Sequence, residues 1–470
     1  MSPDKETLLR SKTEEAPLDE IVFADFKEIH PQDVYTNLTV RGDERKQHIK
    51  DTWHRGGDAN LTATLDEQDL TEKVDKLLQF KHDLLTRNDL GEDVKQLYRW
   101  KVNEDIANIR MLQASARGDM RAFRRYNEFI YGKPDESVYR AALDFVAHDA
   151  EKILASDSSD EAKEAARRAL EQVEDKRGDR NLLYPESEVF EQLREDHWRT
   201  GGYYALLLVG VEIPDGKITP EVGTPILQTV VQDNLQSEYT LQPTKSSSWE
   251  VAHRDESVKY PENYNMSRER YIGLALGHEV GTHLLEVANG LRGPLLLGSI
   301  GLDRQEAGGE GRGVVREQLV YDNFGDFTEL VRWRDLLRRH ITISYAYGLD
   351  GGEKASHEVY EFVNAIDMMY QFVDTPEKTI DEIADMCQAK TDTLLLRVLK
   401  GTDGKGGAYL KDKVYLEGQV AVWKTAAKRG VKNVSSGDAA KFDISNPRHI
   451  TKLQKLGVLP SDDLDDRIGL

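Results

Sequence analysis

The sequence contains a single cysteine, Cys387, and no apolar run that approaches the ~20 residues needed to cross a bilayer as a helix. One cysteine excludes an internal disulfide, so any metal site would need histidine and carboxylate ligands. The first residues, MSPDKETLLRSKTEEAP, lack the basic segment and apolar core of a secretory signal. These absences predict a cytoplasmic protein that neither spans nor enters a membrane.

Basic residues are also scarce relative to acidic ones. The chain has 63 Lys and Arg against 84 Asp and Glu, a formal net charge of -21. Nucleic acids and anionic membrane surfaces bind through basic faces, so the composition argues against both as partners. The length of 470 residues suits two domains or one large domain with extensions. The composition gives no indication of the oligomeric state.

Three regions differ in character. Residues 1–65 are polar and weakly periodic, and we interpret them as a partly ordered N-terminal extension. Residues 66–200 carry apolar residues at helical spacing, which predicts a helical N-terminal region. Residues 201–470 form the third region. It starts with short apolar, β-branched stretches, predicted as strands at 205–213, 226–232, 237–244 and 246–253, and continues with helices at 267–287, 312–339, 358–372, 378–399, 414–429 and 447–456. The predicted fold class is α+β, helix-dominated, with a small sheet before the most informative helix.

That helix contains HEVGTH, in which His278, Glu279 and His283 stand together. The familiar H-E-x-x-H zinc motif places its histidines four residues apart on one helix face. Here they are five apart, a rotation of about 140° in a regular helix. Both rings can reach one ion only through a π-bulge or local unwinding, and Gly281 is where the backbone could yield. For a bare motif of this spacing, two unrelated histidines on a core helix are the commoner explanation.

The third ligand of a hydrolytic zinc site should lie on the next element. Such a site has three protein ligands and an open position for water. The downstream segment LDRQEAGGEGRGVVREQL supplies Glu306, Glu310 and Glu317. Chemistry alone does not separate them, and a solvated carboxylate at a helix end explains each equally well.

Several separate segments resemble one family of zinc metallopeptidases. They are YNEFIYGKP, HEVGTHLLEVANG, EGRGVVREQL, LLLRVLKG followed by AYLKDKVYLEG, and FDISNPRHITKLQKLGVL. Bacterial members of the family are named for a QEGLA motif, and animal members are the microtubule-associated tyrosine carboxypeptidases. The resemblance covers roughly residues 68–458 and excludes the first 65.

The resemblance implies a zinc-dependent carboxypeptidase that hydrolyses the C-terminal residue of a peptide or protein. It implies His278, His283 and Glu310 as Zn²⁺ ligands and Glu279 as the catalytic base. A base directly after the first ligand would share its rigid element and hold the attacking water near the metal.

Binding of a terminal carboxylate requires a fixed cation or a set of donors. Arg397, Lys411 and Tyr415 are candidates because they fall in segments that resemble the family. Arg312 is a candidate peculiar to this chain, because QEGLA is replaced by GEGRG. An ordinary ion pair or hydrogen bond is the competing explanation for each. The acidic chain and Arg312 together predict a C-terminal residue other than tyrosine, and a substrate other than the acidic tail of tubulin.

Three further residues are weaker candidates. Trp249 lies on a predicted strand whose edge could hold an extended peptide, although a core tryptophan is the commoner case. His253 and His148 are candidates for supporting the metal ligands, with ordinary structural histidines as the alternative. Two other functions stay open: a zinc endopeptidase, and an inactive family member that serves as a binding scaffold.

Overall fold

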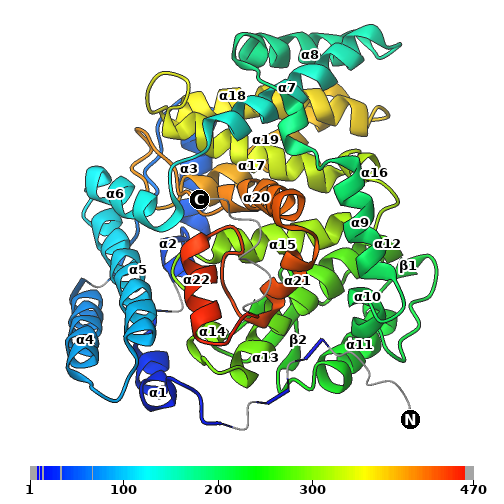
Figure 1. Ribbon diagram of the computed structural model, residues 1–470. Helices are drawn as coiled ribbons and strands as arrows, with labels where there is room; N and C mark the ends of the chain where they lie inside the picture. The colour runs from blue at the N-terminus through cyan, green and yellow to red at the C-terminus, as the bar shows by residue number, and fades with distance from the viewer. Residues whose placement is uncertain (1–7, 10, 13–14, 32–33, 66, 461–470) are drawn as a thin grey trace.

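The computed structural model describes residues 8–9, 11–12, 15–31, 34–65 and 67–460. Helices surround a central group of helices and two small sheets (Figure 1). The prediction of a helix-dominated α+β fold is therefore confirmed. Within the described residues, no helix is both long and apolar enough to cross a membrane.

The N-terminal half is almost entirely helical. Its elements are α1 (Glu20–Ile29), α2 (Val34–Leu38), α3 (Asp43–His54), α4 (Glu67–Thr86), α5 (Glu92–Ala116), α6 (Met120–Tyr131), α7 (Glu136–Ala155), α8 (Asp160–Val173), η1 (Glu174–Lys176), η2 (Arg180–Leu183), α9 (Ser187–Trp198) and α10 (Tyr203–Leu207). Asp119, Asp135 and Ser159 accept hydrogen bonds from backbone N–H groups at the starts of α6, α7 and α8, as N-cap residues do.

The described part of the N-terminal segment is not an extension but part of the core. Phe26 of α1 and Trp53 of α3 are fully or almost fully buried. The Asp19 carboxylate accepts hydrogen bonds from the backbone N–H groups of Leu296 and Leu297 at 2.7 and 2.8 Å. Helix α1 therefore packs onto the C-terminal half of the protein, where the sequence had led us to expect a partly ordered extension. Most residues of this segment are polar, and only a few apolar side chains, such as Phe26 and Trp53, anchor it in the core. Its composition therefore gave no sign that it is packed.

The middle of the chain contains the sheets. Its elements are β1 (Lys217–Ile218), α11 (Pro220–Gln228), η3 (Thr229–Asn234), β2 (Thr240–Thr244), β3 (Glu250–Ala252), β4 (Ser257–Pro261) and β5 (Met266–Ser267). Strands β1 and β5 pair antiparallel, and the other sheet has the order β2-β4-β3. The strands predicted within 237–244 and 246–253 are present. Those predicted at 205–213 and 226–232 are wrong, because helical elements occupy parts of both ranges and no strand does.

The C-terminal half is helical again and contains the predicted helices. Its elements are α12 (Arg268–Arg270), η4 (Tyr271–Leu284), α13 (Leu285–Arg292), α14 (Leu297–Ile300), α15 (Glu306–Gln318), α16 (Phe324–Thr328), α17 (Val331–Tyr347), α18 (Ser356–Asp374), α19 (Ile380–Val398), α20 (Lys413–Arg429), α21 (Lys432–Ser436), η5 (Gly437–Ala439) and α22 (Pro447–Lys455). The single helix predicted at 312–339 is three helices.

Helix α15 packs against both η4 and α20 at the centre of the molecule. The contact with α20 is close because glycines meet there: a Cβ on Gly311 would lie 2.3 Å from the carbonyl carbon of Gly418. The glycine-rich GGEGRG segment is therefore a packing surface of a helix rather than a flexible turn. This close packing brings α15 beside the HEVGTH segment.

Candidate metal centre

The HEVGTH segment lies in a π-helix, η4, that continues directly into α13. A π-helix has i→i+5 backbone hydrogen bonds, so residues five apart lie about one turn apart on the same face. His278 and His283 have this spacing. The irregularity that the sequence required is therefore present, and it extends over 14 residues rather than a single bulge.

Gly281 has a different role from the one that its position suggested. A Cβ at this residue would lie 1.7 Å from the hydroxyl oxygen of Tyr203 and 2.7 Å from the Leu276 carbonyl oxygen. The glycine thus leaves space for Tyr203 of α10 against the π-helix. Arg316 fixes the same point, since its Nη1 donates a hydrogen bond of 2.6 Å to the Gly281 carbonyl.

Three predicted ligands lie together. Oε2 of Glu310 is 3.2 Å from Nε2 of His278 and 3.5 Å from Nε2 of His283. Potential ligand atoms of all three residues lie within 4.8 Å of one another. Zinc bonds of about 2.0–2.1 Å would place two ligand atoms of a tetrahedron about 3.3 Å apart. The spacing therefore fits a metal ion held by His278, His283 and Glu310.

The other two carboxylates of α15 have different partners. Oε2 of Glu306 lies 3.4 Å from the Lys411 ammonium. Oε1 of Glu317 lies 2.6 Å from Nδ1 of His278, behind the ring as seen from Glu310. Among the three carboxylates that chemistry alone left open, only Glu310 lies in the metal-ligand cluster.

Glu317 orients the His278 ring. Because its carboxylate accepts the Nδ1 proton, the lone pair of Nε2 is directed at the metal position, as in carboxylate–histidine–zinc arrangements. Arg332 donates two hydrogen bonds of 2.8 and 3.0 Å to the same carboxylate. Burial would raise the pKa of Glu317, but the charges of Arg332 and His278 lower it to about 2. Gly313 holds the ring from the side: a Cβ there would lie 2.8 Å from its atoms.

A buried charge network lies behind His283. Oε2 of Glu286 is 4.0 Å from Nδ1 of His283, and the other carboxylate oxygen accepts a short hydrogen bond from Arg312. Asp438 accepts hydrogen bonds from both Arg312 and Arg316. Two carboxylates and two guanidinium groups thus compensate one another inside the protein.

Arg312 is consequently not a substrate-binding residue, and that prediction was wrong. Its side chain is fully buried in this network and does not line the cavity. Burial lowers its pKa to about 10, so the guanidinium remains charged at neutral pH. The Arg312 side chain points into the protein interior, behind the cluster of His278, His283 and Glu310.

Glu279 lines the cavity next to the ligand cluster and has no hydrogen bond to a described side chain. Burial raises its pKa above the ordinary value of 4.5. The ligand Glu310 shows the opposite shift: although burial would raise its pKa, the charge of His283 and hydrogen bonds from both histidines hold it well below 4.5. The two neighbouring carboxylates therefore differ in basicity, and Glu279 is the better proton acceptor.

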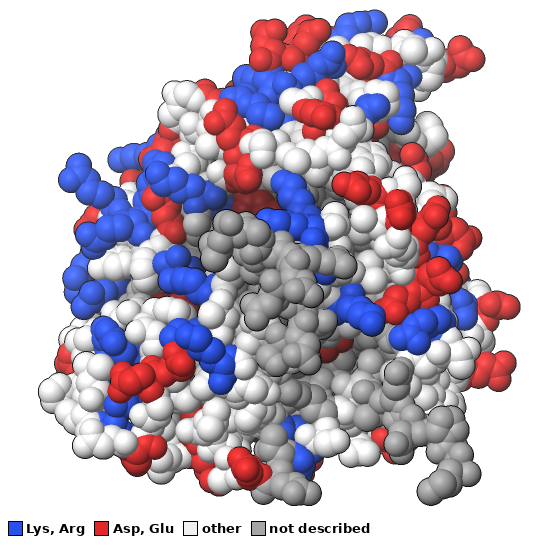
Figure 2. All heavy atoms as spheres, viewed as in Figure 1, with Lys and Arg blue, Asp and Glu red and all other residues white. Residues whose placement is uncertain are grey.

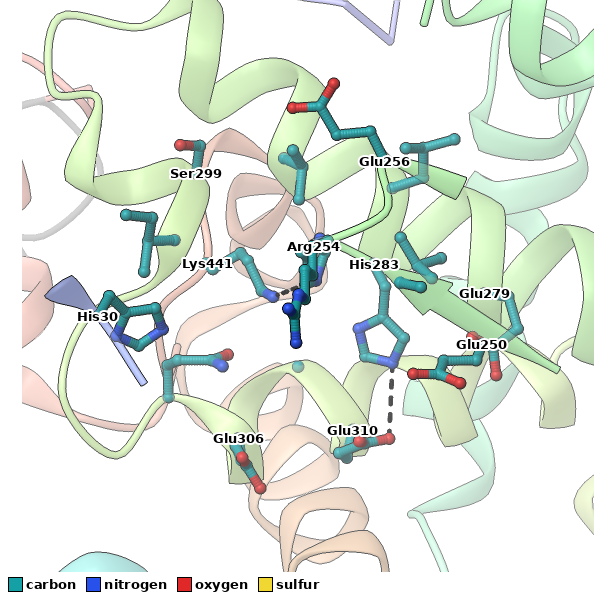
Figure 3. A pocket seen from close by; sticks show the side chains of 18 of the residues that line it. His30, Glu250, Arg254, Glu256, Glu279, His283, Ser299, Glu306, Glu310 and Lys441 are labelled. Atoms are coloured by element: carbon teal, nitrogen blue, oxygen red, sulfur yellow. Dashed lines mark hydrogen bonds and ion pairs between the residues drawn. The ribbon is translucent and has the colours of Figure 1, made fainter. Parts of the chain in front are cut away.

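The cluster opens onto a cavity of about 1190 Å³ (Figure 3). Arg397, Lys411 and Tyr415 all line this cavity, together with Glu279, His283 and Glu310. Arg397 donates two hydrogen bonds to Asp412, one of them 3.0 Å long. The Tyr415 ring stacks near His278, with centroids 6.5 Å apart. The cavity extends to α1, where Phe23 and His30 form part of its wall.

The remaining candidates differ in position. Trp249 lines the cavity but is largely buried, with its ring 5.1 Å from that of Tyr264. His253 also lines the cavity, whereas His148 lies on α7 away from it. Sequence reasoning missed Lys441, whose ammonium lies 2.8 Å from Nε2 of His253. No local motif marks this lysine, because its partner is 188 residues away.

Comparison of the chain with protein-family models, with curated protein sequences and with solved structures finds no match.

Proposed function

We propose that the protein is a zinc-dependent metallopeptidase that acts as a carboxypeptidase. The observation that carries the proposal is the convergence of His278, His283 and Glu310 at the wall of a large cavity, with Glu279 beside them. Two histidines, one carboxylate and a separate glutamate base are the group set of hydrolytic zinc sites. The resemblance to the QEGLA-motif family supports the same assignment.

The chemistry that a bound Zn²⁺ supplies at such a site is polarisation of a water molecule and of the scissile carbonyl. The protein's own contribution is to hold the ligands and to move protons. Glu317 fixes the proton of His278 on Nδ1, and Glu310 stays ionised. Glu279, whose pKa is raised by burial, accepts the proton of the attacking water and passes it to the leaving amine.

A peptide substrate is supported by the strand at the cavity wall. Strand β3 pairs with β4 on one side only, in the part of the chain that the structure describes, and residues 248–253 line the cavity. An extended peptide can add to such an edge through main-chain hydrogen bonds. Backbone recognition of this kind suits a peptidase better than a zinc hydrolase for small molecules.

An endopeptidase is the second candidate. The cavity of about 1190 Å³ extends from Glu310 to His30, so it has room for residues beyond a single cleaved one. A third possibility is an inactive scaffold. It does not explain why Glu317, itself bound by Arg332, orients the ring of His278. We favour the carboxypeptidase because several cations, including Arg397 and Lys411, line the cavity.

The test is mass spectrometry of peptides with randomised C-termini after incubation with the zinc-loaded protein. A carboxypeptidase removes one residue from the free acid and leaves the matching C-terminal amide intact. Internal cleavage of both forms would establish the endopeptidase. Absence of cleavage by the wild type, at the level of the Glu279→Gln variant, would leave the scaffold.

A further inference from the structure

The Lys441 side chain reaches the cavity from the segment that follows η5, and Figure 3 shows it pointing inward on the side away from Glu279. It is only 7% exposed. Its backbone is held at both ends: its N–H donates to the Gly298 carbonyl at 2.8 Å, and its carbonyl accepts from Leu302 at 3.0 Å. The ammonium is therefore presented to the cavity from a fixed point.

The partner of this ammonium is a neutral ring. Nε2 of His253 lies 2.8 Å from Nζ of Lys441, and Nδ1 lies 3.2 Å from the Tyr239 hydroxyl. Burial, followed by the charge of Lys441, holds the pKa of His253 well below 6.5. The neutral imidazole therefore accepts a hydrogen bond from Lys441 through Nε2 and directs its Nδ1 proton at Tyr239.

Lys441 differs from Lys411, Arg397 and Lys101 of the same cavity because no described carboxylate forms an ion pair with it. Lys411 lies 3.4 Å from Glu306, and Arg397 donates to Asp412. Lys101 is paired with Glu104 at 2.6 Å. Burial lowers the pKa of Lys441 to about 8, as expected for an ammonium without a counterion. A buried ammonium in this state gains from an anion that enters the cavity.

We propose that Lys441, positioned by His253, binds a carboxylate of the peptide substrate inside the cavity. This proposal rests on the proposed peptidase function and names a residue and a ligand chemistry for it. The carboxylate comes either from the C-terminus of the peptide or from an acidic side chain next to the cleaved bond.

Binding is measured by fluorescence anisotropy with the zinc-loaded Glu279→Gln variant, so that hydrolysis does not intervene. Four labelled peptides are compared. They are identical except for the last residue, which is Glu or Gln, and for the C-terminus, which is a free acid or an amide. In the Glu279→Gln background, Lys441→Met weakens binding of the peptides that carry the recognised carboxylate by about tenfold or more. This is the size expected for a hydrogen bond to a charged group. Lys441→Arg keeps a cation and restores part of the affinity.

The pattern of the loss identifies the source of the carboxylate. If Lys441→Met weakens binding of the free acids but not of the amides, Lys441 binds the terminal carboxylate. If it weakens binding of the peptides that end in Glu but not of those that end in Gln, Lys441 binds the side-chain carboxylate. Lys27→Met is the control and should leave the discrimination intact, because Lys27 lines the same cavity but its ammonium lies 3.3 Å from the carboxylate of Glu256.

Equal affinities of the Lys441→Met and parent proteins for all four peptides would overturn the proposal, as would loss of discrimination in Lys27→Met alone. In either case hydrolysis of peptides by the wild type would still stand. If the parent binds none of the peptides and the wild type cleaves none, the peptidase function fails as well. A thermal melt of each variant separates loss of binding from loss of folding.

Discussion

Each histidine of the metal centre has a carboxylate behind it, and each carboxylate has an arginine. Glu317 joins His278 to Arg332, and Glu286 lies between His283 and Arg312. The parallel is incomplete, since Glu317 contacts its histidine at 2.6 Å and Glu286 stays 4.0 Å away. His278 is consequently the more rigidly held of the two ligands.

We expect Glu317→Gln to weaken Zn²⁺ binding by about 10- to 100-fold, because an amide neither holds the Nδ1 proton as firmly nor adds negative charge. Competition with a chromophoric chelator measures the dissociation constant. Glu306→Gln, on the same helix, is the control and should leave it unchanged. Equal zinc affinities for Glu317→Gln and the wild type would remove Glu317 from the site.

We expect Glu279→Gln to keep the fold and the zinc and to lower kcat by at least ~10², because the attacking water loses its proton acceptor. Elemental analysis and steady-state kinetics on a cleaved peptide make the two measurements. Activity close to that of the wild type would assign the base to another carboxylate, with Glu317 and Glu286 next to be tested.

At the scale of elements, the π-helix is what brings two histidines five residues apart into one cluster that could hold a metal ion. The sequence showed that an irregular helix was needed, because His278 and His283 would otherwise diverge. It did not show the cause. Tyr203 of α10 occupies the space left by Gly281, and Arg316 of α15 binds the carbonyl at the same point. Tyr203 and Arg316 are far from Gly281 in the sequence, so no local sequence pattern predicts these contacts.

The two wrong strand predictions have a related cause. Residues 205–213 and 226–232 are short apolar runs, which look alike whether they are buried as strands or as helices. Tyr204 and Leu207 are buried on one side of a short helix, and Leu227 and Val230 on one side of a helical pair. Tertiary packing decided their conformation. The long helices were predictable because their apolar residues repeat over several turns.

We expect Gly281→Ala to destabilise the protein by about 1–3 kcal/mol, the usual cost of overpacking a core, since the new Cβ collides with the Tyr203 hydroxyl. Urea unfolding measures the loss. Tyr203→Phe removes the oxygen and should restore part of the stability in the double variant. Simple additivity of the two substitutions would contradict this account of Gly281.

At the scale of the molecule, acidic residues outnumber basic ones, with a net charge of -21. On the face seen in Figure 2, Lys and Arg are more numerous on the left and Asp and Glu on the right, and both signs occur at the top. The important charges lie inside, around the metal centre, where they are compensated in pairs. Stability of the whole protein should therefore depend on pH through these interior groups.

In the metal-free protein, we expect Glu317, Glu417 and His278 to contribute their full stabilisation between about pH 4.5 and 6.5. Burial would raise the pKa of Glu317 and of Glu417 on α20, but Arg332 and His278 lower the first to about 2, and His340 and Lys413 lower the second to about 2. The stability that these carboxylates add is therefore full above pH 4.5 and is lost as the pH falls towards 2. Burial would lower the pKa of His278, but Glu310 and Glu317 raise it from 6.5 to about 10, so its contribution is full below 6.5 and is lost as the pH rises towards 10.

Urea unfolding at a series of pH values in the presence of a chelator measures both limbs. The shifts correspond to about 3 kcal/mol for each glutamate and about 5 kcal/mol for His278, and Glu317→Gln should flatten the acid limb. Zinc should abolish the alkaline limb at His278, because a metal-bound imidazole is already neutral. An alkaline limb of equal size with and without zinc would contradict this assignment.

Helix α1 and the residue after it, His30, form part of the cavity wall, and this bears on which ligands the cavity can accept. The metal centre is built from η4 and α15, whereas Phe23 and His30 reach the same cavity from a segment outside the resemblance to the QEGLA-motif family. In the proposed peptidase, substitutions at Phe23 or His30 would change the shape of the cavity without changing His278, Glu279, His283 or Glu310. Substrate fit and hydrolysis would then depend on separate elements of the chain.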